Sequence, residues 1–295
     1  MHIRFFSIAV AMLGLVPGLL RAQEFPFTRA ENVDGARFVW FSYSRAGFPY
    51  QYTRAETFPD HPGFRAVTDP QVGDVVWWPE YMAVFADSNR VVTAEGSVLL
   101  QQLAERFGTP QYFRHRIPKG QEGPGLAVNP FRLIAGRVEF AAPVGWRILN
   151  QMQQDTIGMA VFHVPNAWTD SASSDRTNVL VIVRQRGDDQ SLQSFSDSLF
   201  ANMIGDQQPV VVLDGSEGPA TRIITWRGNL RGTPYLISDR FAVANGVYLN
   251  LRVSRPTVDI IPESWIQTFA EELERLLVGL TVDGDPVFLE MVREP

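Results

Sequence analysis

Residues 34–46 read Asp-Gly-Ala-Arg-Phe-Val-Trp-Phe-Ser-Tyr-Ser-Arg-Ala, and they form the strongest helical pattern in the first third of the chain. Asp34 is a favourable N-cap residue, and Gly47 stands where a helix commonly stops. Between them, aromatic and aliphatic residues occur on nearly every side of the expected helix. A helix that is apolar all round is usually buried. The stretch therefore predicts a buried central helix from about Asp34 to Ala46.

Short β-strands are predicted downstream of this helix. Residues 70–78 read Pro-Gln-Val-Gly-Asp-Val-Val-Trp-Trp, so that a turn is followed by an apolar strand. Two further strand-like runs, 82–86 and 90–94, are separated by Asp-Ser-Asn, which favours a tight turn. A helix over 98–107 and a strand over 111–117 complete the pattern. The expected arrangement is one buried helix against a small antiparallel sheet.

The order and spacing of these segments resemble the NlpC-like cell-wall endopeptidases, which have a papain-like fold. Their pattern is Asp-Cys-Ser-x-Phe-Val, then a Pro-Gly-Asp-Leu-Val strand, then His-Val-Gly-Ile-Tyr, then Ile-His-Ala. On that pattern the catalytic cysteine falls on Gly35, the catalytic histidine on Tyr81 and the third polar residue on Thr93. The resemblance therefore implies an NlpC-type domain over residues 23–117 in which all three catalytic positions are replaced.

The replaced residues cannot perform the chemistry of the family. A papain-like nucleophile is a cysteine at a helix N-terminus, where the helix dipole and an imidazolium stabilise the thiolate. Gly35 has no side chain, and a tyrosine such as Tyr81, with an ordinary pKa of about 10, cannot cycle a proton at neutral pH. Ser42 and Ser44 lie two turns along the helix, away from its N-terminus. The resemblance also implies that Gly35→Cys would present an activated thiol to a cleft.

A cleft without catalysis is still able to bind a ligand. Aromatic and carboxylate side chains near the lost triad are candidates for lining a groove for peptide or sugar. These candidates are Trp77, Trp78, Glu80, Tyr81 and Glu95. Neighbouring residues of a strand point to opposite faces, so only one of the two tryptophans is expected to face the groove. The alternative is that these residues are purely structural.

Residues 118–125, Pro-Lys-Gly-Gln-Glu-Gly-Pro-Gly, are the clearest break in the chain and predict a linker. In the following domain, residues 126–295, two helices are predicted from apolar residues at three- and four-residue steps, from Leu192 to Met203 and from Ile266 to Leu280. The acidic segments 214–218 and 283–286 match neither a calcium loop nor a nucleophile elbow and are predicted as turns. The predicted strands are 137–140, 159–164, 178–184, 210–213, 221–226, 235–243 and 247–253.

This second domain resembles the PsbP-like or DcrB-like domains. The resemblance is carried by Phe-Ala-Ala-Pro-Val-Gly-Trp at 140–146, followed by strands, a helix, a meander and a C-terminal helix. It implies an α/β/α sandwich with an antiparallel sheet, and a role in binding or assembly. The whole chain is therefore expected to be an α+β protein of two domains.

The first 22 residues predict a secretory signal. Arg4 precedes an apolar run, Phe5–Leu20, and the small residue Ala22 marks the cleavage site. Removing Arg4 and Arg21 changes the formal net charge from −6 to −6 − 2 = −8. Such an acidic protein has no overall basic field to attract nucleic acid or anionic lipid. The absence of cysteine excludes disulfides, lipoprotein attachment and thiolate chemistry.

Together these patterns predict a catalytically inactive, exported protein that binds or scaffolds in the cell envelope, in the periplasm or outside the cell. A peptidoglycan peptide or an envelope protein is the expected partner, with no cofactor, no metal and no membrane span after signal cleavage. Two alternatives stay open. One is an active peptidoglycan or peptide hydrolase that uses non-standard residues, and the other is a protein whose PsbP-like domain carries the function.

Overall fold

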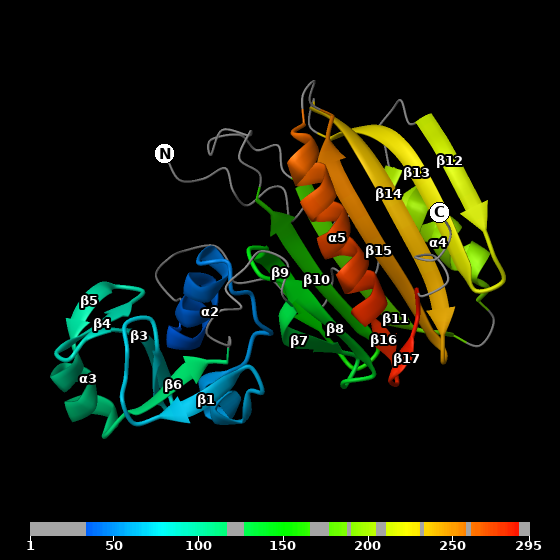
Figure 1. The fold of residues 1–295 in the computed structure, drawn as a ribbon. Coiled ribbons are helices and arrows are strands. Elements are labelled where there is room, and N and C mark those ends of the chain that lie inside the picture. Colours follow the sequence, from blue (N-terminus) through cyan, green and yellow to red (C-terminus); the bar gives the residue numbers. More distant parts are fainter. Residues whose placement is uncertain are drawn as a thin grey trace. The chain divides into compact units, whose positions relative to one another are not determined.

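The structure of the protein, a computed structural model, describes residues 34–116, 127–165, 177–187, 190–204, 211–230, 233–257 and 261–288. The chain divides into two units (Figure 1). Among the described residues, the first unit comprises 34–116, 127–131 and Ala141–Arg147, and the second comprises Arg132–Phe140 and the described residues from Ile148 onward. The predicted signal peptide, residues 1–22, and the predicted linker, residues 118–125, lie outside the described residues.

The predicted first helix is present as α2, Gly35–Arg45. Asp34 caps it, because its Oδ1 accepts a hydrogen bond from the backbone N–H of Arg37 at 2.7 Å. The helix is followed by Gly47, whose φ of 85° is one that a residue with a side chain rarely adopts. Cap and stop residues therefore set the limits of this helix as the sequence predicts.

A six-stranded sheet with the order β1-β6-β2-β3-β4-β5 packs against α2, and each pair of neighbours is antiparallel. The expected arrangement of one buried helix, α2, against a small antiparallel sheet is present, and a second helix, α3, packs on the other face of this sheet. The elements of this unit besides α2 are η2 (Ala55–Asp60), β1 (Phe64–Val67), β2 (Val75–Trp78), β3 (Tyr81–Asp87), β4 (Arg90–Thr93), β5 (Gly96–Leu99), α3 (Leu100–Phe107) and β6 (Gln111–His115).

The two faces of this sheet carry different helices. One face packs on α3, and its buried cluster joins Leu103 of that helix to Val76, Trp78, Ala83, Phe85 and Val91. The opposite face packs on α2, where the ring of Tyr43 lies 5.4 Å from that of Phe64 on β1. Adjacent residues of a strand point to opposite faces, so Trp77 and its cross-strand partner Met82 lie on the α2 side.

The sequence misplaces the start of the second helix in this unit. Residues 98–107 were expected to be helical, but α3 begins at Leu100 and the preceding residues form β5. Val98 pairs with Val91 of β4, and Gly96 pairs with Thr93 at the turn. This cross-strand pairing overrides the local helical pattern. β1 and η2 also have no counterpart among the predicted elements.

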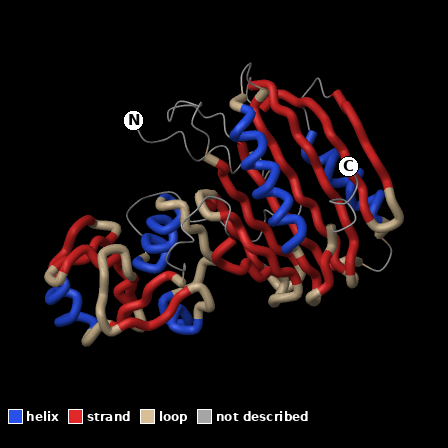
Figure 2. Tube along the Cα trace, viewed as in Figure 1, coloured by secondary structure: helices blue, strands red, loops and turns tan. Residues whose placement is uncertain are grey.

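The second unit is built on a seven-stranded sheet with the order β12-β13-β14-β15-β11-β10-β9, antiparallel from β12 to β10. Helices α4 and α5 lie on opposite faces of it (Figures 1 and 2). The predicted α/β/α sandwich with an antiparallel sheet is confirmed, as is the α+β class. Its elements are β9 (Arg147–Gln153), β10 (Ile157–Val164), β11 (Thr177–Gln185), α4 (Leu192–Ile204), β12 (Val211–Glu217), β13 (Thr221–Leu230), β14 (Thr233–Ala244), β15 (Val247–Pro256) and α5 (Glu263–Gly279).

A smaller four-stranded sheet has the order β17-β16-β8-β7. The turn predicted at 283–286 is present between its last two strands, where Asp283 and Gly284 have φ values of 52° and 88°. The other predicted acidic turn is wrong, because Asp214 to Glu217 belong to β12 and pair with β13 beyond a bulge. The strands are β7 (Ala127–Leu133), β8 (Val138–Pro143), β16 (Thr281–Val282) and β17 (Asp285–Pro286), of which β7, like β9, was not predicted.

A buried ion pair lies in the core between the large sheet and α4. Asp239 of β14 accepts two hydrogen bonds from Arg252 of β15, from Nε at 2.8 Å and from Nη2 at 2.8 Å. Trp226 Nε1 and Asn250 Nδ2 donate to the same carboxylate at 3.0 and 3.1 Å. Four donors therefore satisfy a carboxylate that is fully buried.

Candidate functional site

Gly35 is the first residue of α2 and is packed directly on the backbone of β3. A Cβ atom built on Gly35 would lie 2.2 Å from the carbonyl oxygen of Met82 and 2.7 Å from its nitrogen. Real Cβ contacts essentially never fall below 3.0 Å, and here the obstacle is backbone. The position that corresponds to the catalytic cysteine is closed to any side chain. The expectation that Gly35→Cys would present a thiol to a cleft is therefore wrong.

The other two vestigial positions point away from Gly35. Tyr81 is paired with Trp78, and both pack with the cluster on the α3 side of the sheet. Thr93 follows Val91 at a two-residue step on β4 and therefore lies on that same side. Gly35 contacts Met82, which lies on the α2 side. The structure thus brings Tyr81 and Thr93 together and separates them from Gly35 by the sheet itself.

Tyr81 and Thr93 meet at Glu95, in the turn after β4. The Thr93 hydroxyl donates to Glu95 Oε2 at 2.8 Å and accepts from the Glu95 N–H at 3.2 Å. The Tyr81 hydroxyl donates to the same Oε2 over 3.5 Å. The hydrogen bond from Thr93 lowers the pKa of Glu95, while burial, and then the charge of Glu95, raise the pKa of Tyr81. Glu95 is thereby held ionised, and Tyr81 is held neutral.

An aromatic stack extends this cluster onto α3. The rings of Tyr81 and Phe107 lie parallel, with centroids 5.1 Å apart and an interplanar angle of 5°. The guanidinium carbon of Arg106 lies 4.8 Å from the centroid of Phe107. Phe107 and Arg106 were missing from the predicted site, because only the folding of α3 onto β3 places them beside Tyr81. The four residues Tyr81, Glu95, Arg106 and Phe107, here called the α3-side cluster, combine an aromatic stack with one carboxylate and one cation.

The remaining predicted site residues have separate surroundings. Trp78 is fully buried and donates from Nε1 to the carbonyl of Gly108 at 2.8 Å. Trp77 is half-buried on the α2 side and donates to the carbonyl of Ala55 at 2.6 Å. The two tryptophans therefore face opposite sides, as predicted, and both anchor backbone. Glu80 is exposed in the turn between β2 and β3.

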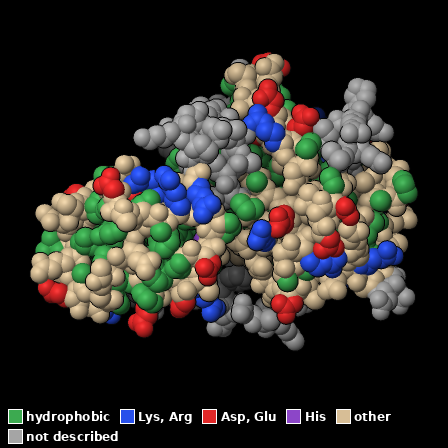
Figure 3. Space-filling view, turned by 60° about the horizontal axis from the view of Figure 1, so that its bottom comes forward, with side chains coloured by type: hydrophobic (Ala, Val, Ile, Leu, Met, Phe, Trp, Pro, Cys, Tyr) green, Lys and Arg blue, Asp and Glu red, His purple; other side chains and the backbone are tan. Residues whose placement is uncertain are grey.

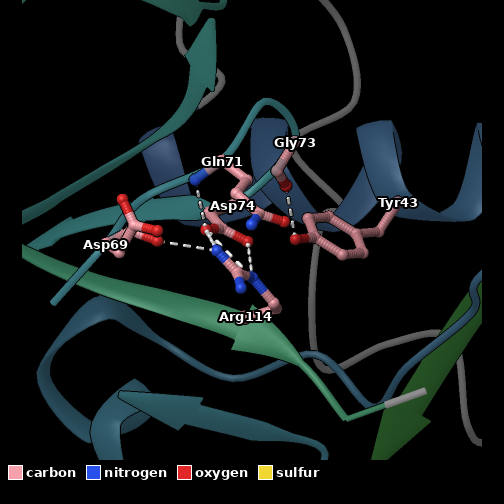
Figure 4. Close-up of polar contacts among 6 residues, drawn as sticks. All are labelled: Tyr43, Asp69, Gln71, Gly73, Asp74 and Arg114. Carbon is pink, nitrogen blue, oxygen red and sulfur yellow. Dashed lines mark hydrogen bonds and ion pairs between the residues drawn. The ribbon is translucent and has the colours of Figure 1, made fainter. Parts of the chain in front are cut away.

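A polar cluster that sequence reasoning missed fixes the turn before β2 (Figure 4). The buried carboxylate of Asp74 accepts from Arg114 Nε at 3.0 Å and Nη2 at 2.8 Å, and from the Gln71 N–H at 2.7 Å. The Tyr43 hydroxyl of α2 donates to the Gly73 carbonyl at 2.6 Å. The Gly-Asp pair at 73–74 was a signal for this turn. Its partner Arg114 lies forty residues away and is not visible from the sequence pattern.

Two histidines lie in the aromatic core on the α2 side. His61 Nδ1 accepts the Gly63 N–H at 3.0 Å, and its Nε2 lies 3.2 Å from the Gln51 carbonyl, which fits a neutral ring with the proton on Nε2. Burial lowers the pKa of His61 to about 4. Burial, and then the nearby His61, lower the pKa of His115 to about 4. Both rings are therefore neutral core residues at pH 7, and neither adjoins the α3-side cluster.

Within the described ranges, no three histidine or acidic side chains come together in a way that could hold a metal ion. No helix in the described parts of the chain is long and apolar enough to cross a membrane. On the face drawn in Figure 3, acidic and basic side chains are interspersed over the second unit, and apolar side chains gather over the first. The first unit therefore offers the more apolar surface on that face.

The chain matches no protein-family model, and it matches no curated protein. Among solved structures it is similar to the Ran-binding protein Mog1p of Saccharomyces cerevisiae, with 10% identity, a TM-score of 0.37, and coverage of 52% of this chain and 94% of that one. It is also similar to LpqN of Mycobacterium tuberculosis, which is involved in cell envelope biogenesis, with 12% identity, a TM-score of 0.32, and coverage of 49% and 82%. Similarities at these values identify neither a shared family nor a shared function.

Proposed function

We propose that the protein is a catalytically inactive, exported component of the cell envelope that binds or scaffolds. The observation that carries this proposal is the contact of Gly35 with the backbone of Met82, which leaves no space for a nucleophile at the helix N-terminus. Tyr81 and Thr93 support it further, because their side chains lie on the other side of the sheet and are occupied by Glu95 and Phe107.

We further propose that the first unit is related to the NlpC-type domains and the second to the PsbP-like domains. Support for the first relationship is the order of the elements, since α2 precedes the turn at Asp74 and the strands β2, β3 and β4. Support for the second is the antiparallel sheet between α4 and α5. The relationship proposed for the first unit concerns its scaffold and not a catalytic geometry.

The α3-side cluster is the binding surface that we propose for this unit. Its aromatic stack offers an apolar platform, and Arg106 and Glu95 add opposite charges beside it. A peptidoglycan stem peptide carries both carboxylate and amino groups, so such a peptide matches this combination. Arg106 and Glu95 are exposed and are therefore free to contact a ligand.

The experiment combines binding with a search for turnover. The mature protein would be sedimented with purified peptidoglycan and incubated with stem peptides, and the soluble fraction would be analysed by mass spectrometry. We expect retention on peptidoglycan without new peptide products. Arg106→Gln should weaken retention several-fold, whereas Arg45→Gln, an equivalent change at the exposed end of α2, should not.

Turnover that survives purification and is lost in Glu80→Gln or Tyr81→Phe would establish the alternative, an active hydrolase with non-standard residues. Equal retention of the Arg106→Gln and Arg45→Gln variants would remove the α3-side cluster as the binding surface. Retention that requires only the second unit would place the function in the PsbP-like part.

A further inference from the structure

Three arginines lie on one face of the large sheet in the second unit. In the register of β13, β14 and β15, Leu236 is paired with Arg227 on one side and with Arg255 on the other. Arg240 lies on the same face of β14, four residues beyond Leu236. This is the face opposite to α4, because the alternating residues Trp226 and Ile237 pack on Phe195 and Leu199 of that helix.

Two of these arginines, Arg227 and Arg240, lie on strands that extend beyond the described helix on this face, α5. α5 crosses the same side of the sheet in front of β11 and β15, and β13 and β14 extend beyond it (Figure 1). Arg227 is exposed, and Arg240 and Arg255 are half-buried. Between the three arginines lie the hydroxyl groups of Thr225 and Ser238, which are directly paired and also half-buried. Solvent therefore reaches this surface, and the two hydroxyl groups provide hydrogen-bond donors between the arginines.

None of the three arginines has a carboxylate partner among the described residues. Among the described residues, the side chain of Arg240 makes one hydrogen bond, from Nη1 to Ser238 Oγ at 3.3 Å, and the side chains of Arg227 and Arg255 make none. Several other arginines of this unit do form ion pairs, among them Arg252 with Asp239, Arg137 with Asp283 and Arg222 with Asp197. Burial lowers the pKa of Arg240 below its ordinary value, and the charge of Asp239, on the opposite face of the sheet, offsets this effect only in part.

We propose that Arg227, Arg240 and Arg255 form a binding site for the phosphoryl group of a ligand. Neighbouring strands lie about 4.8 Å apart and successive residues rise by about 3.4 Å, so the backbones of Arg227 and Arg255 are roughly 10 Å apart and Arg240 lies roughly 13 Å along β14 from their rung. Extended side chains from these three positions are able to converge above Ser238. Guanidinium groups bind phosphoryl oxygens in bidentate fashion, and the two hydroxyls add further donors.

The negative net charge of the chain does not oppose this site. Net charge describes the field at long range, whereas the contacts proposed here are local and lie within one Debye length. On the same face, the acidic residue placed closest in the register is Asp214, which pairs with Thr225 at the edge strand β12 and is exposed. The competing explanation is that the arginine stems only cover the apolar residues Leu236 and Leu251.

The test uses the whole mature protein and two probes of the same chemistry. Pyrophosphate binding would be measured by calorimetry, and co-sedimentation with phosphatidylglycerol vesicles would be compared with phosphatidylcholine vesicles. We expect saturable binding to at least one probe. Arg240→Gln should raise the dissociation constant about tenfold or more, and Arg227→Gln or Arg255→Gln several-fold, since each removes a charged donor. Arg184→Gln is the matched control, because Arg184 is exposed on the α4 side of the same sheet.

Binding to pyrophosphate that the three variants weaken identifies a soluble phosphorylated ligand, and binding only to phosphatidylglycerol vesicles identifies a lipid headgroup as its source. If Arg240→Gln fails to fold, the proposal is tested with Arg227→Gln, because Arg227 is exposed and its replacement should not affect folding. No binding to either probe overturns the proposal, and so does binding that Arg184→Gln weakens as much as Arg227→Gln does.

Discussion

The N-terminus of α2 in the first unit and the arginine face in the second unit differ in an instructive way. The first carries a motif that points to a catalytic site, but Gly35 is closed off by Met82 and the matching residues lie across the sheet. The second carries no motif, yet register places three arginines without carboxylate partners in the described chain on one accessible face. The spacing of residues along the chain therefore predicts helices and strands. Which side chains come together is determined by strand alternation and register.

The pH dependence of the unfolding free energy should differ strongly between the two units. His61 and His115 have folded pKa values of about 4, below the ordinary value of 6.5, so between these limits the unfolded chain binds protons that the folded chain does not. The free energy of unfolding of the first unit should therefore have its full value above pH 6.5. It should decrease as the pH falls from 6.5 towards 4, by about 3 kcal/mol per histidine. Denaturant unfolding at a series of pH values measures this decrease. His61→Gln should flatten the curve, and His163→Gln, in the second unit, should leave it unchanged.

Removing the partner of a buried arginine should cost almost as much. Asp239→Asn leaves Arg252 in the core beside α4 without its counter-charge, and such losses amount to about 3–5 kcal/mol. Arg240→Gln, on the other face of the same sheet, breaks no ion pair and should change the unfolding free energy by less than about 1 kcal/mol. Urea denaturation of both variants compares a paired with an unpaired arginine. Equal losses would mean that Arg240 is a structural residue.

A smaller but decisive loss is expected from Gly35→Ala. The added Cβ would lie 2.2 Å from the Met82 carbonyl oxygen, so helix and strand must separate, at a cost of about 2–3 kcal/mol. Gly279→Ala is the control, because it ends α5, has open space around its Cβ and should be neutral or slightly stabilising. Thermal unfolding of the two variants measures the difference. A Gly35→Ala variant as stable as the control would show that the helix N-terminus is open.

The smallest effect concerns the α3-side cluster. Tyr81→Phe removes a long hydrogen bond to exposed Glu95 but keeps the stack on Phe107, so stability should fall by less than about 0.5 kcal/mol. Thr93→Val removes the shorter bond to Glu95 from a buried position and should cost about 1 kcal/mol. The urea denaturation midpoints of the Tyr81→Phe and Thr93→Val variants measure these two losses of stability. A larger loss for Tyr81→Phe would indicate that its hydroxyl has a structural role in this turn.

Local signals in the sequence predicted much of the fold. The cap at Asp34, the helical steps from Leu192 and from Ile266, and the Asp283-Gly284 turn each depend on residues close together in the chain. β5 was missed because Val98 depends on its pairing with Val91. The site was predicted only in part for the same reason. Tyr81, Thr93 and Glu95 do meet, but Phe107 and Arg106 join them through tertiary packing, and Gly35 is excluded by strand alternation.

The reactivity of a thiol placed at position 35 shows whether the N-terminus of α2 is closed by β3. Gly35→Cys would be made alone and together with Tyr81→His and Thr93→His, and the alkylation rate of the folded protein would be measured against pH. We expect a destabilised protein whose thiol reacts no faster than a free cysteine, with a pKa of about 8.5 or above, and no acceleration from the two histidines on the opposite face. A variant that is as stable as the unmodified protein, reacts rapidly below pH 7 and becomes faster still with the histidines would contradict this expectation.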